Sequence, residues 1–467
     1  MQTQYIAPFT NPSLWAQDQW GHAELGDIRR TRRAVTLGTC IAAHSAASLP
    51  RQTKDWGSLK AAYRLLNEED ITHTNISSPH WHATRVQAEV AETPVVLFVQ
   101  DGSELNFTSH LALEGAGFVG DGKGYGFELH SCLAVIPDTT NPDILGLAHQ
   151  VVWARHHEPR RAREKRTDHY HRHTEGEVWA ETLETIGDAP GDTLWVSVGD
   201  RGSDIFSYVR RAQALNWHVL LRVQKDRRIL GEDGSAGRMK EYVRSLPPVQ
   251  ATKTVVQRTR TGHEKRNVSL QISWSSVTLL LPSNDPREKT SEPISDVVIR
   301  CWNDTENMEW ILFTTVPLES HDALEQISWY EHRWIIEEYH KCLKTGCAIE
   351  KRQLATSHGL LALLGFLAIT AVRLLHLRGV ARTTPKQRAI DASIEPLFLH
   401  LVAAYLKQEE AELTLAQFWK GVAMLGGFIG RTNDGEPGWQ TLWDGWRRLQ
   451  DMSWGAELMK AELGRCG

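Results

Sequence analysis

Cysteine is scarce in this sequence, and no two cysteines form a metal-binding pair. Six cysteines are spread over 467 residues, none of them in a Cys-x-x-Cys arrangement. This spacing excludes the common structural zinc sites and favours free thiols in a reducing compartment. The first residues, MQTQYIAPFT, also lack the basic start and apolar centre of a secretory signal. We therefore expect a cytoplasmic protein.

Long apolar runs are absent as well. The longest uncharged apolar stretch, GLLALLGFLAITAV, covers residues 359–372, whereas a membrane-spanning helix needs about 20 such residues. We therefore expect this stretch to form a buried helix, and we expect no membrane partner.

The sequence has no excess of positive charge. Its 52 Lys and Arg residues are outnumbered by 57 Asp and Glu residues, which gives a formal net charge of −5. This total argues weakly against a nucleic-acid partner, but binding depends on local patches rather than on the sum. Basic patches are present at residues 29–33, 154–173, 253–266 and 333–344. The His-rich stretch 154–173 is interpreted as an exposed loop.

The chain is too long for one hydrophobic core, so we expect two or three domains. Helical spacing dominates its two ends, and strands alternate with helices in the middle. We predict an α/β multidomain protein with a helical domain over residues 1–75, an α/β domain over 76–382 and a second helical domain over 383–467. Alternating strands and turns predict an all-β insertion at about 225–316 within the α/β domain.

Two of the predicted strands end in aspartate. PVVLFVQD ends at Asp101, and DTLWVSVGD ends at Asp200. The carboxyl ends of neighbouring strands meet at one edge of an open α/β sheet. Paired aspartates there would form a concentrated negative site that a divalent ion such as Mg²⁺ stabilises. Taken singly, each aspartate is more simply explained as a turn or helix-cap residue.

The stretch YEHRWIIEEYHKCLKTG, residues 330–346, supplies a third carboxylate. We predict that it lies in one long helix ending at Lys344. At about 100° per residue, an arc of about 80° on that helix contains Tyr330, Arg333, Glu337, Lys341 and Lys344. Apolar residues such as Ile335 and Ile336 gather on the opposite side, and Glu338 lies at the margin of the charged face. The simpler alternative is an ordinary Glu337–Lys341 pair one helical turn apart.

A basic cluster stands near the amino terminus. It consists of Arg29, Arg30, Arg32 and Arg33 in the segment ELGDIRRTRR. Two interpretations are open: a solvated helix face, which is the usual fate of a charge run, or a set of contacts with DNA phosphates.

Together these motifs resemble those of a known enzyme family. The spacing Tyr330-x2-Arg333-x3-Glu337-x6-Lys344 matches the YREK signature of DDE transposases of the insertion-sequence-four family. Further segments resemble other motifs of that family in the same order: LGDIRRTRR, KAAYRLL, VQDGSELNF, VGDRGSDIFSY and GWQTLWDGW. The resemblance extends over nearly the whole chain.

The resemblance implies a fold and a set of functional residues. The fold would be a ribonuclease H-like catalytic core with a β insertion, flanked by N-terminal and C-terminal helical domains. The catalytic and metal-binding triad would be Asp101, Asp200 and Glu337, with two Mg²⁺ ions per active site and Mn²⁺ as a substitute. DNA contacts would come from Tyr330, Arg333, Lys341, Lys344, Trp310, Arg29, Arg30, Arg32, Arg33 and Lys60. Of these, Trp310 would receive a flipped base.

The activity implied by the resemblance is cut-and-paste transposition. The enzyme would bind the inverted-repeat ends of its transposon, cleave them by metal-dependent hydrolysis through a hairpin, and join the 3′-OH ends to target DNA. A homodimer paired through the segment 439–463 would hold two DNA ends at the bacterial nucleoid. Three alternatives stay open: a catalytically silent DNA-binding relative, a metal-dependent nuclease without strand transfer, and a structural protein.

Overall fold

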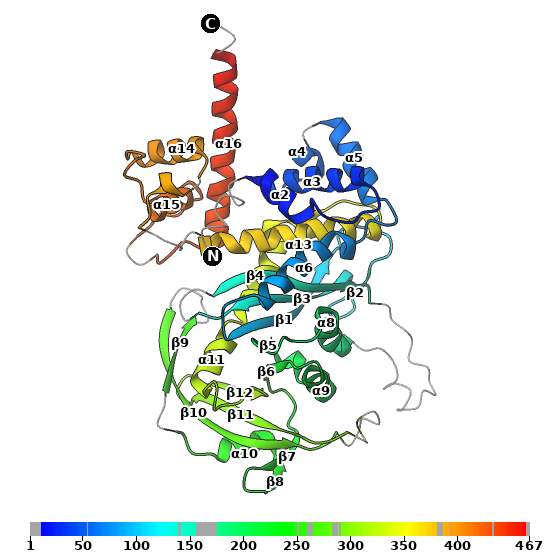
Figure 1. Ribbon diagram of the computed structural model, residues 1–467, viewed down its shortest axis with the longest axis vertical. Helices are drawn as coiled ribbons and strands as arrows, with labels where there is room; N and C mark the ends of the chain where they lie inside the picture. Colours follow the sequence, from blue (N-terminus) through cyan, green and yellow to red (C-terminus); the bar gives the residue numbers. More distant parts are fainter. Residues whose placement is uncertain are drawn as a thin grey trace.

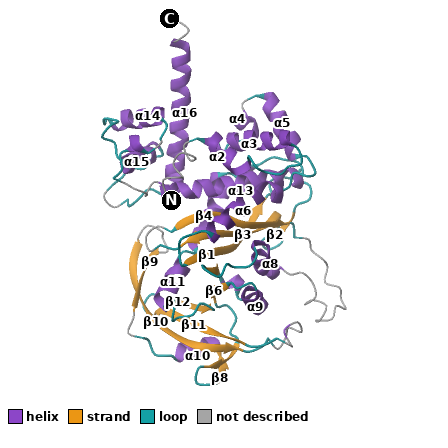
Figure 2. Cartoon of the chain, in the orientation of Figure 1, coloured by secondary structure: helices purple, strands orange, loops and turns teal. Residues whose placement is uncertain are grey.

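The computed structural model describes most of the chain. The described residues are 11–53, 55–138, 142–155, 175–249, 252–258, 265–282, 288, 291–380, 386–392, 394–431 and 434–463. One large sheet lies below helices that come from both ends of the chain (Figure 1), and the strands cross the molecule between helices on both faces (Figure 2). Most of the basic stretch 154–173, and residues 259–264 of the basic stretch 253–266, lie outside the described residues.

The first described part of the chain is helical, as predicted. Its helices are α2 (Pro12–Trp20), α3 (Ile28–Ala43), α4 (Leu49–Thr53), α5 (Trp56–Leu66) and α6 (His73–Glu89). The side chains of Asn11, Asp27, Asp55 and Thr72 each accept a hydrogen bond from a backbone amide of the first turn that follows. These caps satisfy amides that have no partner within the helix. The predicted domain boundary at residue 75 falls inside α6, which continues against the sheet.

The centre of the molecule is a mixed sheet. Its first strands are β1 (Val95–Asn106), β2 (Gly117–Val119), β3 (Gly124–Ile136), β4 (Asp143–Trp153), β5 (Leu194–Gly199) and β6 (His218–Arg222). Along this part of the sheet the order is β4, β3, β1, β5, β6. Strand β1 is antiparallel to β3 and parallel to β5, and β5 is parallel to β6. The predicted alternation of strands and helices in the middle of the chain is confirmed.

Alternate residues of β1 face two different hydrophobic cores. Leu97 and Val99 pack into the core that includes the helices from both ends of the chain. Phe98 points the other way and packs with α8 (Val178–Ile186) and α9 (Phe206–Ala214). A strand buried on both faces has a nearly continuous apolar sequence, which explains why PVVLFVQ shows no alternation of polar and apolar residues.

The predicted β insertion is present, with two differences. Its elements are β7 (Arg228–Gly231), β8 (Ala236–Arg238), α10 (Met239–Ser245), β9 (Thr252–Arg258), β10 (Lys265–Leu279), β11 (Ile294–Asn303) and β12 (Met308–Thr314). The insertion is not all-β, because it contains α10. The segment NVSLQISW and the first three residues of VTLLLPS form the single strand β10, without the turn that the predicted alternation of strands and turns places between them. Strand β12 pairs with β6, so the insertion continues the central sheet.

The long helix predicted to end at Lys344 is interrupted. Helix α11 covers Ala323–Glu331, α12 covers Trp334–Lys341, and a π-helical turn covers Cys342–Gly346. Between α11 and α12 the backbone bonds span three residues instead of four: the N–H of Arg333 donates to the carbonyl of Tyr330, for example. His332 is buried at this junction, so tertiary packing decides the direction of the chain here. One helical wheel therefore does not describe the whole motif.

The apolar stretch 359–372 lies inside α13 (Ser357–Val380), a buried helix as predicted. By length and composition Ser357–Leu377 could cross a membrane, but 89% of its most apolar window is buried inside the protein. The helix runs between the amino-terminal helices and the sheet (Figure 1) and contacts both α6 and α12.

The last described helices are α14 (Pro396–Leu406), α15 (Leu415–Leu425) and α16 (Trp439–Leu463). The first part of α16 packs against α13, α14 and α15, and Trp439 at its start is buried. The rest of α16 projects away from the molecule (Figure 1) and exposes Trp454, Leu458 and Met459. The predicted domain boundary at residue 382 lies outside the described residues.

Candidate active site

Asp101 and Asp200 lie at the same edge of the central sheet. Asp101 belongs to β1, and Asp200 follows β5 directly. The parallel register of these strands pairs Val99 with Val198, so the two aspartates, each two residues further along, come level with each other. The Asp200 side chain also caps the short helical turn that follows it, accepting a hydrogen bond from the backbone N–H of Gly202 at 2.7 Å.

Asp101 holds its proton more tightly than an ordinary aspartate. Burial and the negative charge of Asp200 raise the pKa of Asp101 to about 6, and the charge of Glu337 acts in the same direction. The positive charge of Arg333 and a hydrogen bond from the backbone N–H of Gly102 oppose this rise in pKa. Three carboxylates that repel one another therefore meet near this edge of the sheet.

Arg333 connects two of these carboxylates. One guanidinium nitrogen donates to Asp101 Oδ2 at 3.0 Å, and another donates to the Glu337 carboxylate. The arginine side chain is 23% exposed and the Glu337 side chain 57%, so Glu337 lies on the open side of the pair. Ile335 and Ile336, predicted to face away from the charged side, are fully buried.

The two adjacent glutamates point to different partners. Glu338 Oε2 accepts a hydrogen bond from the indole N–H of Trp439 at 2.6 Å, which ties α12 to the start of α16. The Lys341 ammonium lies 3.9 Å from the other oxygen of Glu338. In the described part of the chain Lys341 thus forms its ion pair with Glu338, and the pair of the simpler alternative, Glu337–Lys341, is not formed. The preceding turn and the bond to Trp439 rotate the two carboxylates apart.

Tyr330 and Trp310 form an aromatic pair beside the carboxylates. Their ring centroids are 5.5 Å apart and their planes meet at 66°. Tyr330 is only 4% exposed, and this burial raises the pKa of its hydroxyl, against the opposing effect of the cations Arg333 and Arg222. The tyrosine thus reaches the site from α11, although the turn before α12 separates it from Glu337.

Lys344 lines a cavity that does not include this aromatic pair. The cavity has a volume of about 460 Å³ and is also lined by Gly102, Ser103 and His130. The π-helical turn that carries Lys344 has a wider backbone than an α-helix, a form that often occurs at functional sites. The cavity adjoins the residue that follows Asp101, so the lysine charge is available near the carboxylates.

A buried polar network, which the sequence did not reveal, underlies the two aspartates. Gln100 Nε2 donates to Ser197 Oγ at 2.8 Å, and the Tyr208 hydroxyl donates to the same oxygen at 2.7 Å. Burial lowers the pKa of His130 to about 3, so its neutral ring donates from Nε2 to Gln100 Oε1 at 2.8 Å. The only sequence signal was the single polar residue inside each of two apolar strands. The network links β1 to β5 directly beneath Asp101.

A second buried network holds α12. Gln150 Nε2 donates to the Tyr339 hydroxyl and to Ser131 Oγ, both at 2.9 Å. His340 Nε2 lies 3.2 Å from the same serine oxygen, and His73, at the start of α6, contacts Gln150 Oε1 at 2.9 Å. The side chains of Tyr339 and His340 are thereby bonded to strands of the sheet. Gln150 extends this network to His73 in α6.

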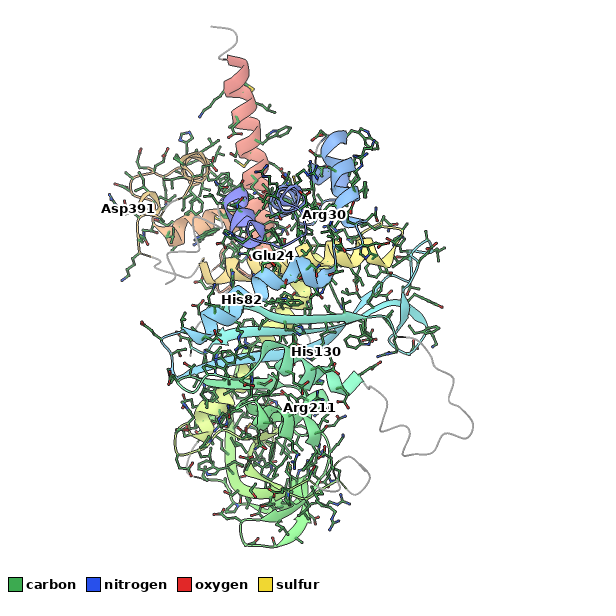
Figure 3. All side chains as sticks on the ribbon, turned by 45° about the vertical axis from the view of Figure 1, so that its right-hand side comes forward. Glu24, Arg30, His82, His130, Arg211 and Asp391 are labelled. Carbon is green, nitrogen blue, oxygen red and sulfur yellow. The ribbon has the colours of Figure 1, made fainter. Side chains whose placement is uncertain are left out.

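The predicted DNA-contact residues of the amino-terminal helices do not form one uniform cluster. Arg30 pairs with Glu68 and Asp70, so part of its charge is compensated within the protein. The exposed members are Arg29, Arg32 and Lys60, and Arg33 is half-buried. Arg30 lies among the helices above the sheet that carries His130 (Figure 3).

A metal ion fits the site by its donor chemistry. Among the described residues, no group of three or more His, Cys, Asp or Glu side chains is close enough to hold one ion. The donors at this edge are carboxylate oxygens, however, which are the ligands that Mg²⁺ prefers. The cationic guanidinium of Arg333 lies between Asp101 and Glu337. Arg333 would have to release a carboxylate for all three to share an ion.

Two parts of the chain match family models of transposases. Residues 12–71 match the family described as Transposase DNA-binding, and residues 153–373 match the family described as Transposase DDE domain. The chain therefore has the architecture of a transposase, with a DNA-binding segment followed by a DDE domain. The second match contains Asp200 and Glu337 and begins after Asp101.

A solved structure is also similar to this chain. It is the cryo-EM structure of a piggyBac transposase synaptic complex with hairpin DNA, with 10% sequence identity and a TM-score of 0.35, and the match covers 96% of this chain and 82% of that chain. A TM-score this low does not establish a shared fold.

Proposed function

We propose that this protein is a cut-and-paste DNA transposase of the insertion-sequence-four type, and that Asp101, Asp200 and Glu337 are its catalytic residues. The observation that carries the proposal is the meeting of these carboxylates. The two aspartates lie level on neighbouring strands, and the third carboxylate is joined to Asp101 through Arg333. The match to the DDE domain supports the reaction class, and the YREK spacing supports the subfamily.

The proposal includes a ribonuclease H-like catalytic core. The strand order β4, β3, β1, β5, β6 supports it, because an antiparallel meander is followed by two strands parallel to β1. Sheets with parallel neighbours gather functional groups at the carboxyl ends of the strands. Asp200 stands at such an end, and Asp101 lies level with it, just past the last pair that β1 forms with β5, although β1 itself continues to Asn106.

The reaction would be phosphodiester hydrolysis followed by strand transfer. Two Mg²⁺ ions, replaceable by Mn²⁺ and held by Asp101, Asp200 and Glu337, would supply an activated water and charge stabilisation at the leaving 3′-oxygen. The freed 3′-OH would attack the opposite strand to form a hairpin. After the hairpin is opened, the same 3′-OH would attack target DNA.

The residues around the carboxylates would position the DNA. Arg333, Lys341 and Lys344 would offer positive charge to phosphates near the cleaved bond. The aromatic pair of Trp310 and Tyr330 would hold a base that has left the stack. The exposed basic residues of the amino-terminal helices would bind the phosphates of the transposon end.

The proposed working unit is a homodimer that holds two transposon ends. The support comes from α16, whose projecting part exposes Trp454, Leu458 and Met459 at 57%, 48% and 62%. Exposed large apolar side chains on one helix favour a protein–protein contact. The bacterial cytoplasm, at the nucleoid, is the proposed location.

The decisive experiment combines the purified protein, Mg²⁺ and linear DNA that carries the candidate inverted repeats. We expect double-strand release with a hairpin product and, with added target, joined DNA. Glu337→Ala should abolish cleavage while leaving DNA affinity largely unchanged, because the substitution removes a proposed metal ligand and no phosphate contact. Glu338→Ala should reduce cleavage less, since its carboxylate is bonded to Trp439.

Equal loss from the two glutamate variants would contradict the assignment of Glu337. Specific binding by the natural protein without any cleavage would identify a catalytically silent relative. Cleavage without joining would identify a nuclease that lacks strand transfer.

A further inference from the structure

The segment between Glu338 and Gly346 is braced by one residue of the carboxy-terminal helix. Trp439, the first residue of α16, donates its indole N–H to Glu338 Oε2 at 2.6 Å. A Cβ added to Gly346 would come within 3.3 Å of the Trp439 ring, so the same indole also lies against the end of the π-helical turn. Trp439 is 3% exposed, and its contacts are therefore with the protein interior.

Each end of this segment is close in sequence to a residue of the proposed active site. Glu338 follows Glu337 directly, and Lys344 lies two residues before Gly346. Helix α12 has only 8 residues, and π-helical turns have poor intrinsic stability. The direction of both functional side chains therefore depends on contacts from outside the segment.

We infer that Trp439 is a positioning residue for Glu337 and Lys344, acting through its hydrogen bond to Glu338. The inference rests on the proposed function of Glu337. The bond holds the Glu338 carboxylate on the side of α16, away from the Asp101–Arg333–Glu337 contacts. The indole ring also lies against Gly346 at the end of the π-helical turn, next to the side chain of Leu374, which is closer still. The start of α16, the proposed dimerisation helix, thus helps to hold α12, the helix that carries Glu337.

The chain offers a matched control for this inference. Trp443 lies one helical turn further along α16 and is equally buried at 3%. Among the described residues its indole N–H has no hydrogen-bond partner. Trp439→Phe and Trp443→Phe therefore remove the same atoms from the same helix, but only Trp439→Phe removes a hydrogen bond.

The experiment measures single-turnover cleavage at saturating DNA, together with the DNA dissociation constant and the melting temperature. Trp439→Phe should slow cleavage by about tenfold, because small misplacements of reacting groups are costly, while DNA affinity stays unchanged. Trp443→Phe should leave the rate within about twofold of the natural protein. Glu338→Gln keeps an acceptor oxygen and should retain most of the rate.

A double-mutant cycle of Glu338→Ala and Trp439→Phe tests the coupling. The double variant should cleave no more slowly than the slower single variant, because both changes break one bond. Rate losses that multiply would overturn the inference, and so would equal rates for the two tryptophan variants.

Amide hydrogen exchange over residues 334–346 separates this inference from the proposed function. Trp439→Phe should speed exchange in this segment, whereas Trp443→Phe should not, whether or not the protein cleaves DNA. If the natural protein fails to cleave, the proposed function is wrong and the exchange data decide the inference alone. Equal exchange in both variants would overturn it.

Discussion

Glu337 and Glu338 are neighbours in sequence but serve different parts of the structure. Glu337 is bonded to Arg333, which also holds Asp101, whereas Glu338 accepts the indole N–H of Trp439. Helical periodicity placed Glu337 on the charged side and Glu338 at its margin. It could not identify the donor to Glu338, because that donor lies 101 positions away in the chain.

The raised pKa of Asp101 predicts a pH-dependent stability. An aspartate with an ordinary pKa of 3.8 that reaches about 6 when folded binds its proton more tightly in the native state. Its ionisation therefore costs stability as the pH rises through this interval, and the cost persists above it. Asp101→Asn should raise the free energy of unfolding at neutral pH by about 3 kcal/mol.

The gain from Asp101→Asn should shrink as the pH falls below about 6 and vanish well below 3.8, where the natural carboxyl is protonated in both states. Urea unfolding of the natural protein and the Asp101→Asn variant across this pH range measures the difference in their free energies of unfolding. If the change in the free energy of unfolding is independent of pH, packing or the contact with Arg333, rather than ionisation of Asp101, controls the effect.

The strands β1 and β5 are joined by side chains as well as by their backbones. Ser197 Oγ accepts hydrogen bonds from both Gln100 and Tyr208, and all three residues are buried. A buried donor that loses its acceptor costs more than the hydrogen bond contributed. This serine therefore fixes the distance between the strands that carry the two aspartates.

Ser197→Ala should lower the free energy of unfolding by about 2 kcal/mol, because two buried donors lose their acceptor. Urea denaturation measures the change. Ser276→Ala is the matched control, since Ser276 is an exposed serine of β10, and its effect should stay within about 0.5 kcal/mol. Equal effects of the two substitutions would contradict the role given to the Ser197 network.

Element types were predicted well where periodicity is local, and poorly where tertiary contacts decide. The apolar segments before Asp101 and Asp200 and the buried helix around 359–372 were visible in the sequence, but the strand end predicted at Asp101 was wrong, because β1 continues to Asn106 through its pairing with β3. The break before α12, where His332 is buried, was not visible. The turn expected between NVSLQISW and VTLLLPS is absent, because β10 continues through both segments as far as Leu279.

The parts of the chain meet at the helix that carries Glu337. Ser45, from the amino-terminal helices, donates to the Gly346 carbonyl at 2.7 Å, and Trp439 contacts the same turn from the other end of the chain. The buried Arg352 donates to the Cys347 carbonyl just beyond. The segment that matches the DNA-binding family, the helix that carries Glu337 and the carboxy-terminal helices are therefore in direct contact at this turn.

Substitutions on the exposed side of α16 should change the number of protomers in the proposed DNA complex. Leu458→Glu combined with Met459→Glu should convert a two-protomer DNA complex into a one-protomer complex, because two charges cannot be buried in an apolar contact. Light scattering after gel filtration measures the mass of the complex. Glu457→Gln, on the same helix, is the control and should leave the mass unchanged. A dimeric complex with the double variant would place the protomer contact elsewhere.

The order of the motifs, the apolar segments before the two aspartates and the spacing of the YREK residues are properties of the sequence alone, because they depend on local periodicity and residue type. The tertiary structure decided which groups meet. The register of β1 and β5 brought Asp101 and Asp200 level, and Arg333, which holds Glu337, also bonds Asp101 from 232 positions away. Such contacts depend on how buried surfaces pack over long separations in the chain, and no local pattern of residues encodes them.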